Sequence, residues 1–173
     1  WVDSQGREVA DLIADDWVAG MQHLLDCQAG LETLFVGYVT GVQDYIDGKC
    51  DIDGVGIKAV DDYTLEYTLE NPTPYFTSML HYGMSLPLSR SYYTSQGGKF
   101  GDDYDSADEG NMYGRDSDHI AYCGPFLTTS VTENNSITYK ANPLYWDAEG
   151  RQDVAKVLGG PGHAVYGHGR AAS

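Results

Sequence analysis

The sequence predicts an α+β fold, in which antiparallel β-hairpins pack with short α-helices. Two stretches, residues 57–70 and 126–141, alternate apolar and polar side chains around a turn-forming segment, which is the pattern of a hairpin. Residues 11–25 instead repeat apolar side chains at the spacing of one helical face. Each hairpin is followed by proline and aromatic residues, which end the strand pairing.

In the helical stretch, five apolar side chains form one stripe: Trp17, Val18, Met21, Leu24 and Leu25. Shorter helices are expected at residues 31–35, 42–46 and 89–96. Gly48 and Gly97 follow two of these runs, and each is expected to close its helix in the left-handed conformation that glycine adopts without strain.

In the second strand of the first hairpin, alternate residues are apolar and are expected to form its buried face: Tyr63, Leu65, Tyr67 and Leu69. Asp61 and Asp62 precede this strand and favour a turn. After the strand, Thr73 is expected to cap a helix over residues 74–82, with Pro74 at its first position.

The second hairpin alternates Ile137, Tyr139 and Ala141 with polar residues, after a turn at residues 133–135. Leu144, Tyr145 and Trp146 follow Pro143 as an aromatic anchor. We expect the three tryptophans, which are Trp1, Trp17 and Trp146, to anchor the core, because buried aromatic side chains dominate core energetics. The acidic residues 101–118 lack periodicity and predict a surface loop.

The amino-acid composition limits which classes of function are plausible for this chain. A net charge of −16 argues against nucleic-acid binding, which needs clustered Lys and Arg. A hydrophobic content of 42% supports a packed core, and no apolar run is long enough to cross a bilayer. Cys27, Cys50 and Cys123 allow one internal bridge and no disulfide framework. The chain begins at Trp1 without a visible signal peptide, so a mature or trimmed product is expected.

Four stretches in register resemble the extracytoplasmic solute-binding proteins of peptide ABC importers, the oligopeptide- and dipeptide-binding proteins of family 5. They are WVDSQG with ADDW (residues 1–6 and 14–17), GIKAVDDYTLE (56–66), PTPYF (72–76), and CGPF with KANPLYWD (123–126 and 140–147). The resemblance covers about residues 1–147 and implies one part of a longer, two-lobed protein with a type II periplasmic-binding-protein-like fold.

The resemblance also implies a domain assignment and a function. Residues 1–121 would form the extra (second) domain, residues 122–150 a hairpin of the first lobe, and residues 151–173 an atypical tail. The parent would capture peptides or a related small solute outside the bacterial membrane and deliver them to an ABC permease, anchored by a lipid and without catalysis. Some family members bind nickel, haem or sugars instead, and the resemblance does not distinguish these ligands from peptides.

Leu31, Glu32 and Phe35 fall near the loop that the family's extra domain offers to bound peptide, although core packing is favoured for Leu31 and Phe35. Two other classes stay open. One is a stand-alone module whose Tyr-rich surface binds glycan or protein, and the other is a hydrolase with a carboxylate pair. If the apolar face of the second hairpin is left bare, the chain should self-associate.

Three further clusters contain residue types that could form a site, and in each the sequence favours a purely structural or solvent-exposed role. The acidic loop, with Asp102, Asp103, Asp105, Asp108 and Glu109, does not have calcium-loop spacing. His163 and His168 lie in a Gly-rich tail, which disfavours a metal site there. Cys27 and His23 stand four residues apart on a helix, and we expect a core cysteine beside a surface histidine rather than a nucleophile. No cofactor is expected.

Overall fold

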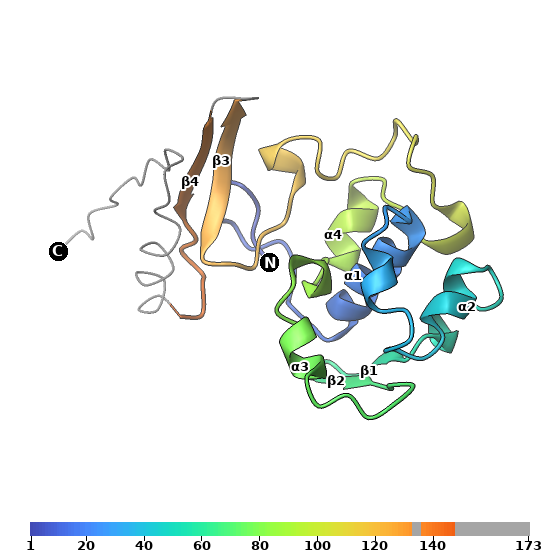
Figure 1. Cartoon of the computed structure of the whole chain (residues 1–173). Helices are drawn as coiled ribbons and strands as arrows, with labels where there is room; N and C mark the ends of the chain where they lie inside the picture. Colours follow the sequence, from blue (N-terminus) through green and yellow to red (C-terminus); the bar gives the residue numbers. More distant parts are fainter. Residues whose placement is uncertain (133–135, 148–173) are drawn as a thin grey trace. The chain divides into compact units, whose positions relative to one another are not determined.

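The computed structural model describes residues 1–132 and 136–147. The chain forms two compact units (Figure 1). One unit is residues 12–111, and the other combines residues 1–11 with the described residues from 112 onward. The predicted boundary near residue 121, between an extra domain and a first lobe, concerns a longer protein and stays a prediction.

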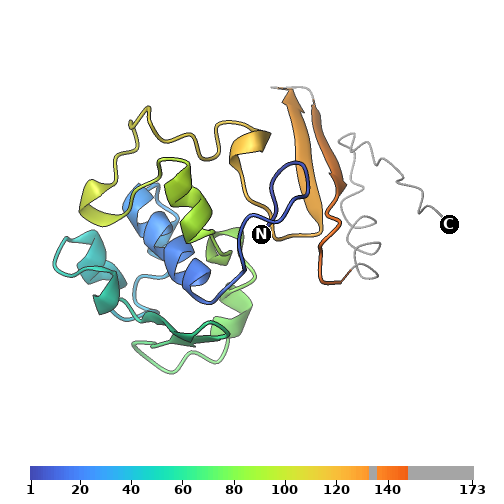
Figure 2. The same cartoon turned by 180° about the vertical axis from the view of Figure 1, so that it is seen from behind.

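The unit of residues 12–111 is built around one central helix. Its helices and strands are α1 (Asp15–Cys27), α2 (Val42–Ile46), β1 (Ile57–Asp61), β2 (Thr64–Tyr67), α3 (Phe76–Met79) and α4 (Arg90–Ser95). Helix α1 lies between α4 and the β1–β2 hairpin, as the two opposite views show (Figures 1 and 2). It also contacts α2, so most elements of the unit bury a face against it.

The core of this unit contains the predicted stripe of α1. Val18, Met21 and Leu25 belong to the buried cluster, and Trp17 and Leu24 pack against it. The other buried members come from the segments around α1: Phe35, Val39, Val42, Val55, Ile57 and Phe76. The stripe predicted from helical spacing is therefore confirmed.

The first predicted hairpin is confirmed as an antiparallel pair, with Ile57 opposite Tyr67 and Ala59 opposite Leu65. A register irregularity lies between Ala59 and Asp61. Tyr63 was expected on the apolar face, and this was wrong, because it lies in the turn with 92% of its surface exposed. The backbone N–H of Tyr63 donates to Asp61 Oδ1 at 2.8 Å, so the aspartate stabilises the turn as expected.

The helix expected over residues 74–82 is shorter than predicted. Helix α3 begins at Phe76 and ends at Met79, and a 3₁₀ turn follows at Gly83–Ser85. The expected cap was also wrong, because Thr73 Oγ1 donates backwards to the carbonyl oxygen of Asn71. Short polar side chains compete with helical hydrogen bonding in this way, so the threonine stabilises the turn before the helix.

Both predicted helix-closing glycines are confirmed. Gly48 follows α2 with φ +70° and Gly97 follows α4 with φ +88°. At each end the glycine N–H and the next N–H reach back to helix carbonyls, in the paired pattern of a Schellman motif. Residues 31–35, expected as a short helix, form a 3₁₀ turn at Glu32–Leu34.

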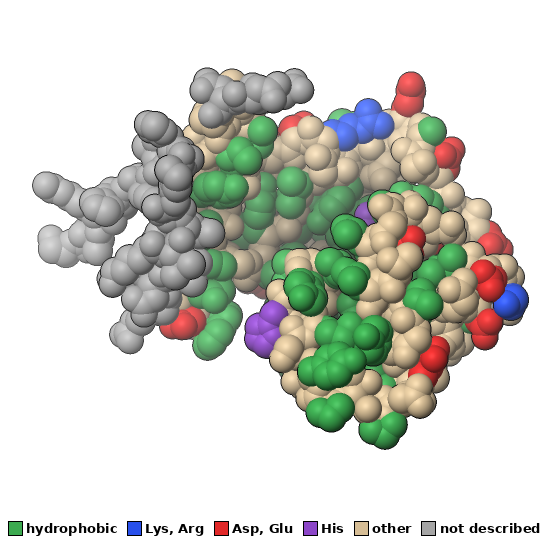
Figure 3. Space-filling view, in the orientation of Figure 1, with side chains coloured by type: hydrophobic (Ala, Val, Ile, Leu, Met, Phe, Trp, Pro, Cys, Tyr) green, Lys and Arg blue, Asp and Glu red, His purple; other side chains and the backbone are tan. Residues whose placement is uncertain are grey.

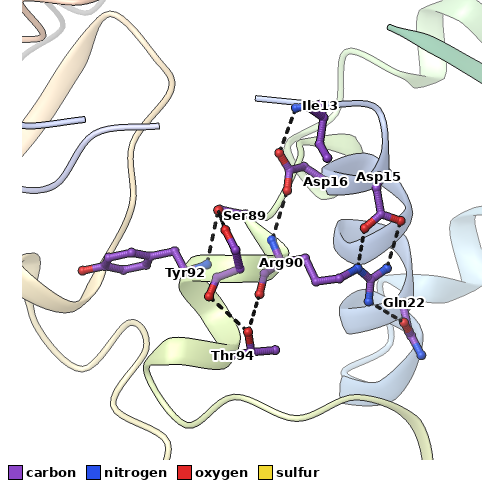
Figure 4. Close-up of polar contacts among 9 residues, drawn as sticks. Ile13, Asp15, Asp16, Gln22, Ser89, Arg90, Tyr92 and Thr94 are labelled. Atoms are coloured by element: carbon purple, nitrogen blue, oxygen red, sulfur yellow. Dashed lines mark hydrogen bonds and ion pairs between the residues drawn. The ribbon is translucent and has the colours of Figure 1, made fainter. Parts of the chain in front are cut away.

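Helix α4 is tied to the start of α1 by two acidic residues (Figure 4). Asp16 is 4% exposed, and its carboxylate accepts the backbone N–H of Ile13 at 3.1 Å and that of Arg90 at 3.0 Å. Asp15 accepts the Arg90 guanidinium at 2.6 Å. Ser89 caps α4 by accepting the Tyr92 N–H. A buried carboxylate thus sets how α4 packs on α1.

The other unit holds the second predicted hairpin, which is also confirmed. Strands β3 (Phe126–Thr132) and β4 (Ser136–Ala141) pair antiparallel, with Phe126 opposite Ala141. Val2 pairs with Tyr122, so the N-terminal segment joins this unit. After β4, the buried Asn142 donates to the Gly124 carbonyl at 2.9 Å and accepts the Leu144 N–H at 2.9 Å, which fixes the turn at Pro143.

The apolar face of β4 is more exposed than the alternation predicted. Ile137 and Tyr139 are 44% and 38% exposed, and hydrophobic side chains gather on the hairpin (Figure 3). Trp146 was expected as a core anchor, and this was wrong, because it is 84% exposed. A two-stranded hairpin offers too little apolar surface to bury an indole. Trp17, by contrast, packs against the core as predicted.

Candidate functional site

The turn after α1 is held by its own acidic residue. Gly30, with φ +96°, donates its N–H to Glu32 Oε2 at 2.8 Å. Thr33 Oγ1 donates to the Gly30 carbonyl at 2.7 Å, and the Phe35 N–H donates to the Glu32 carbonyl at 3.0 Å. With the bond from the Leu34 N–H to the Leu31 carbonyl at 3.2 Å, four hydrogen bonds within six residues therefore fix the shape of this turn.

The three site residues predicted from sequence take different positions in this turn. Phe35 is 1% exposed and belongs to the core, as predicted, and Glu32 is 6% exposed. Leu31 is 52% exposed, so the expectation that it packs in the core was wrong. Leu31 is therefore exposed on a turn that the buried side chain of Phe35 holds to the core. Whether these residues contact a ligand stays a prediction.

A tyrosine pair, formed by the exposed Tyr75 and the half-buried Tyr38, was missed from the sequence. The rings of Tyr38 and Tyr75 meet edge to face, with centroids 6.2 Å apart and hydroxyl oxygens 3.4 Å apart. The Tyr75 hydroxyl donates this hydrogen bond to Tyr38, which raises the pKa of Tyr75. Tyr75 precedes the buried Phe76 in the PTPYF stretch, and this change from exposed to buried aromatic at a helix start was the available signal.

Cys27 and His23 lie together, as their helical spacing predicts, and Tyr104 completes a cluster with them. Cys27 Sγ lies 3.6 Å from His23 Nε2 and 3.0 Å from the Tyr104 hydroxyl. The imidazole is half-buried against the rings of Tyr93 and Tyr104, so the expectation of a surface histidine was wrong. Burial lowers the pKa of His23, with Asp26 opposing the effect, so the imidazole is neutral at pH 7.

A polar cavity of about 530 Å³ adjoins this cluster, and Tyr104, Asp26, Tyr45, Cys50 and Asp102 are among its lining residues. Asp26 accepts the Tyr45 hydroxyl at 2.5 Å and the Gly101 N–H at 2.9 Å. Burial, and then the hydrogen bond to the Asp26 carboxylate, raise the pKa of Tyr45. The last turn of α1 therefore supplies both a thiol and a cavity wall.

The acidic loop forms turns and an ion pair. Asp108 pairs with Lys99 at 2.7 Å, and Asp105 accepts the Ala107 N–H at 2.8 Å. Among residues 1–132 and 136–147, no group of three or more His, Cys, Asp or Glu is arranged to hold a metal ion. His163 and His168, like the rest of the predicted tail, lie outside the described residues. In the described part of the chain, every helix lacks the length and apolar character needed to span a bilayer.

Comparison with known proteins places this chain among binding proteins. Residues 4–158 match the family described as bacterial extracellular solute-binding proteins, family 5 Middle. The chain is 35% identical over 150 residues to the oligopeptide-binding protein SarA of Streptococcus gordonii and 37% identical to AmiA of Streptococcus pneumoniae. Each match covers 86% of this chain, which spans about 21% of the length of either relative.

Solved structures show the same likeness in three dimensions. The substrate-binding domain of a Bacillus anthracis oligopeptide ABC transporter superposes with a TM-score of 0.65 at 30% identity, over 79% of this chain and 24% of that one. Listeria monocytogenes OppA bound to peptide gives a TM-score of 0.62 at 31% identity, over 79% and 25%. The two hairpins with short helices thus form part of a peptide-binding-protein fold, and the chain belongs to the family 5 bacterial extracellular solute-binding proteins.

Proposed function

We propose that this chain forms part of a receptor that captures peptides outside the bacterial membrane and delivers them to an ABC permease. The observation that carries the proposal is the family match over residues 4–158, with relatives that are named oligopeptide-binding proteins. Two of the similar structures hold peptides, from Listeria monocytogenes and Haemophilus influenzae. A lipid anchor on the parent protein is part of the proposal.

The mechanism we propose is closure of lobes around the ligand, a hinge motion without covalent chemistry. In this scheme residues 1–121 act as the extra domain and residues 122–150 belong to the first lobe. The turn after α1 contributes one contact surface. Leu31 touches the peptide, while Phe35 and Glu32 hold the turn, because only Leu31 of the three is exposed. A turn fixed before binding loses little entropy when the ligand arrives.

The site is incomplete within this chain in the proposed scheme. A two-lobed receptor buries its ligand between lobes, and this chain corresponds to about a fifth of its relatives' length. Calorimetry of the chain with a mixed oligopeptide pool should therefore show no saturable heat. A micromolar or tighter constant, about −8 kcal/mol or better, would mean that these residues hold a complete site.

The function itself is tested with the protein encoded by the complete gene. It should bind the oligopeptide pool with saturable heat, and Leu31→Asp should weaken binding by about tenfold or more, since a charge would lie against the ligand. Leu86→Asp is the matched control, because Leu86 is also an exposed leucine of the same unit, at 62% against 52%. Absence of saturable binding by the complete protein would refute the function, and equal losses in both variants would refute the site.

A further inference from the structure

We propose that Cys27 is a thiol modification site, which forms a mixed disulfide with small, positively charged disulfides that enter the adjoining acidic cavity. The proposal is independent of peptide capture. It rests on the arrangement of Cys27, His23 and Tyr104 at the end of α1, and on the residues that line the cavity of about 530 Å³ beside them.

The polar contacts of Cys27 suit the formation of a thiolate. His23 Nε2 lies 3.6 Å from the sulfur, and in the neutral tautomer that carries its proton on Nδ1 it offers a lone pair to accept the proton of the thiol. The Tyr104 hydroxyl, at 3.0 Å, donates a hydrogen bond to the resulting anion. A nearby base and a hydrogen-bond donor are the features that make a cysteine reactive.

Cys50 provides an internal comparison, because it lines the same cavity. The Cys50 thiol donates to the carbonyl oxygen of Gly41, 3.8 Å from the sulfur, and a carbonyl cannot stabilise a thiolate. Burial, together with the charges of Asp44 and Asp51, raises the pKa of this thiol. Cys50 therefore has the more direct access to the cavity, whereas the imidazole and hydroxyl neighbours that could assist a thiol lie at Cys27.

The cavity sets which disulfide is accepted. Three carboxylates line it, Asp26, Asp51 and Asp102, and its one lysine, Lys49, pairs with Asp47 at 2.7 Å. Tyr104 lines the cavity and contacts the sulfur of the partly exposed Cys27, so a disulfide drawn to the cavity is brought near the thiol. The negative lining attracts a cationic disulfide and repels an anionic one.

The chemical step is thiol–disulfide exchange. The proton of Cys27 passes to His23, and the thiolate attacks one sulfur of the small disulfide R–S–S–R. The bond between Cys27 Sγ and one RS group forms as the original S–S bond breaks, and the leaving thiolate takes the proton from His23. Cys27 is oxidised and one RS group is reduced, so no further oxidant is needed.

The test is competition among the three cysteines of the unaltered chain. The chain is incubated with cystamine, a diamino disulfide, quenched with acid, and mapped by mass spectrometry. Cys27 should be modified about tenfold faster than Cys50 or Cys123, and cystamine should react with it about tenfold faster than anionic glutathione disulfide, the lower end of electrostatic rate effects. In the urea-denatured chain these preferences should disappear.

Variants then separate the roles of the thiol's neighbours. Asp102→Asn should reduce the preference for cystamine over glutathione disulfide, whereas Asp103→Asn, next to it in the chain but outside the cavity lining, should not. His23→Gln, checked by circular dichroism, should slow Cys27 alone. Modification of Cys50 or Cys123 as fast as Cys27 in the folded chain, or equal rates with the two disulfides, would overturn the proposal.

Discussion

Replacing Asp16 by Asn tests the role assigned to the buried carboxylate between α1 and α4. The carboxylate accepts two backbone N–H groups, from Ile13 at 3.1 Å and Arg90 at 3.0 Å, and is 4% exposed. Asparagine keeps the shape but has a single carbonyl oxygen, so its amide NH₂ group would face one of the two donors. One hydrogen bond is lost, and a buried N–H is left without its acceptor.

The expected cost follows from these two changes. A hydrogen bond to a charged group contributes about 1.5–3 kcal/mol, and a buried donor without a partner costs about 1–3 kcal/mol. Because these two quantities overlap, Asp16→Asn should lower the free energy of unfolding by about 2–4 kcal/mol. Asp15→Asn removes only the ion pair with Arg90, whose side chains are 40% and 32% exposed, so its cost should stay within about 1 kcal/mol.

Urea unfolding, followed by far-UV circular dichroism, measures both variants against the unaltered chain. Asp15 and Asp16 are neighbours in the first turn of α1, so their similar effects on helix electrostatics cancel in the comparison. Asp16→Asn should shift the midpoint clearly further, with an unchanged slope. If the two variants lose the same stability, Asp16 does not join the helices in the way described.

Three other predictions test the turns, the hairpins and the exposed face. Gly48→Ala should lower the free energy of unfolding by about 1 kcal/mol. Gly41→Ala, at a similar positive φ, should cost at least about 2 kcal/mol more, because its Cβ would lie 2.0 Å from the Gly54 carbonyl oxygen. Equal losses of stability in thermal melts would refute the steric argument. Burial raises the pKa of Tyr67 from 10.0 to about 12, so the stability that this residue contributes is present below pH 10 and lost as pH rises toward 12. Tyr67→Phe should lessen this loss of stability, and an unchanged dependence of the unfolding free energy on pH would contradict the prediction. Self-association should grow with added salt, which screens the net charge of −16, and Trp146→Ser should reduce self-association because it removes an exposed indole. A monomer at both low and high salt in sedimentation would refute this prediction.

The fold was largely predictable where periodicity carries the information. The stripe of α1 and the alternation of both hairpins depend on side-chain spacing alone, and the structure confirms them. Gly48 and Gly97 were equally predictable, because the left-handed conformation at a helix end selects glycine. The prediction of a helix cap failed because a short polar side chain can form a hydrogen bond with either of two nearby backbone groups. Thr73 bonds backwards to Asn71 instead of capping α3, and spacing alone does not decide that choice.

The candidate site was less predictable than the fold. Leu31 and Phe35 are both apolar and lie in one turn, yet one is 52% exposed and the other 1%. Their burial depends on contacts with segments distant in sequence, which periodicity over six residues does not reveal. Tyr104 joins Cys27 across 77 positions, so the sequence could place His23 beside the thiol but not the phenol. Long-range contacts therefore account for what was missed.

Photo-crosslinking from position 31 tests the central claim most directly. A photoreactive amino acid replaces Leu31 in the protein encoded by the complete gene, and a labelled oligopeptide from the bound pool is added before illumination. The peptide should crosslink at position 31, and excess unlabelled peptide should abolish the product. The same residue at position 86, where an exposed leucine also lies in this unit, should give only background. Equal crosslinking from both positions, or none from position 31 in a protein that binds the peptide, would contradict the account.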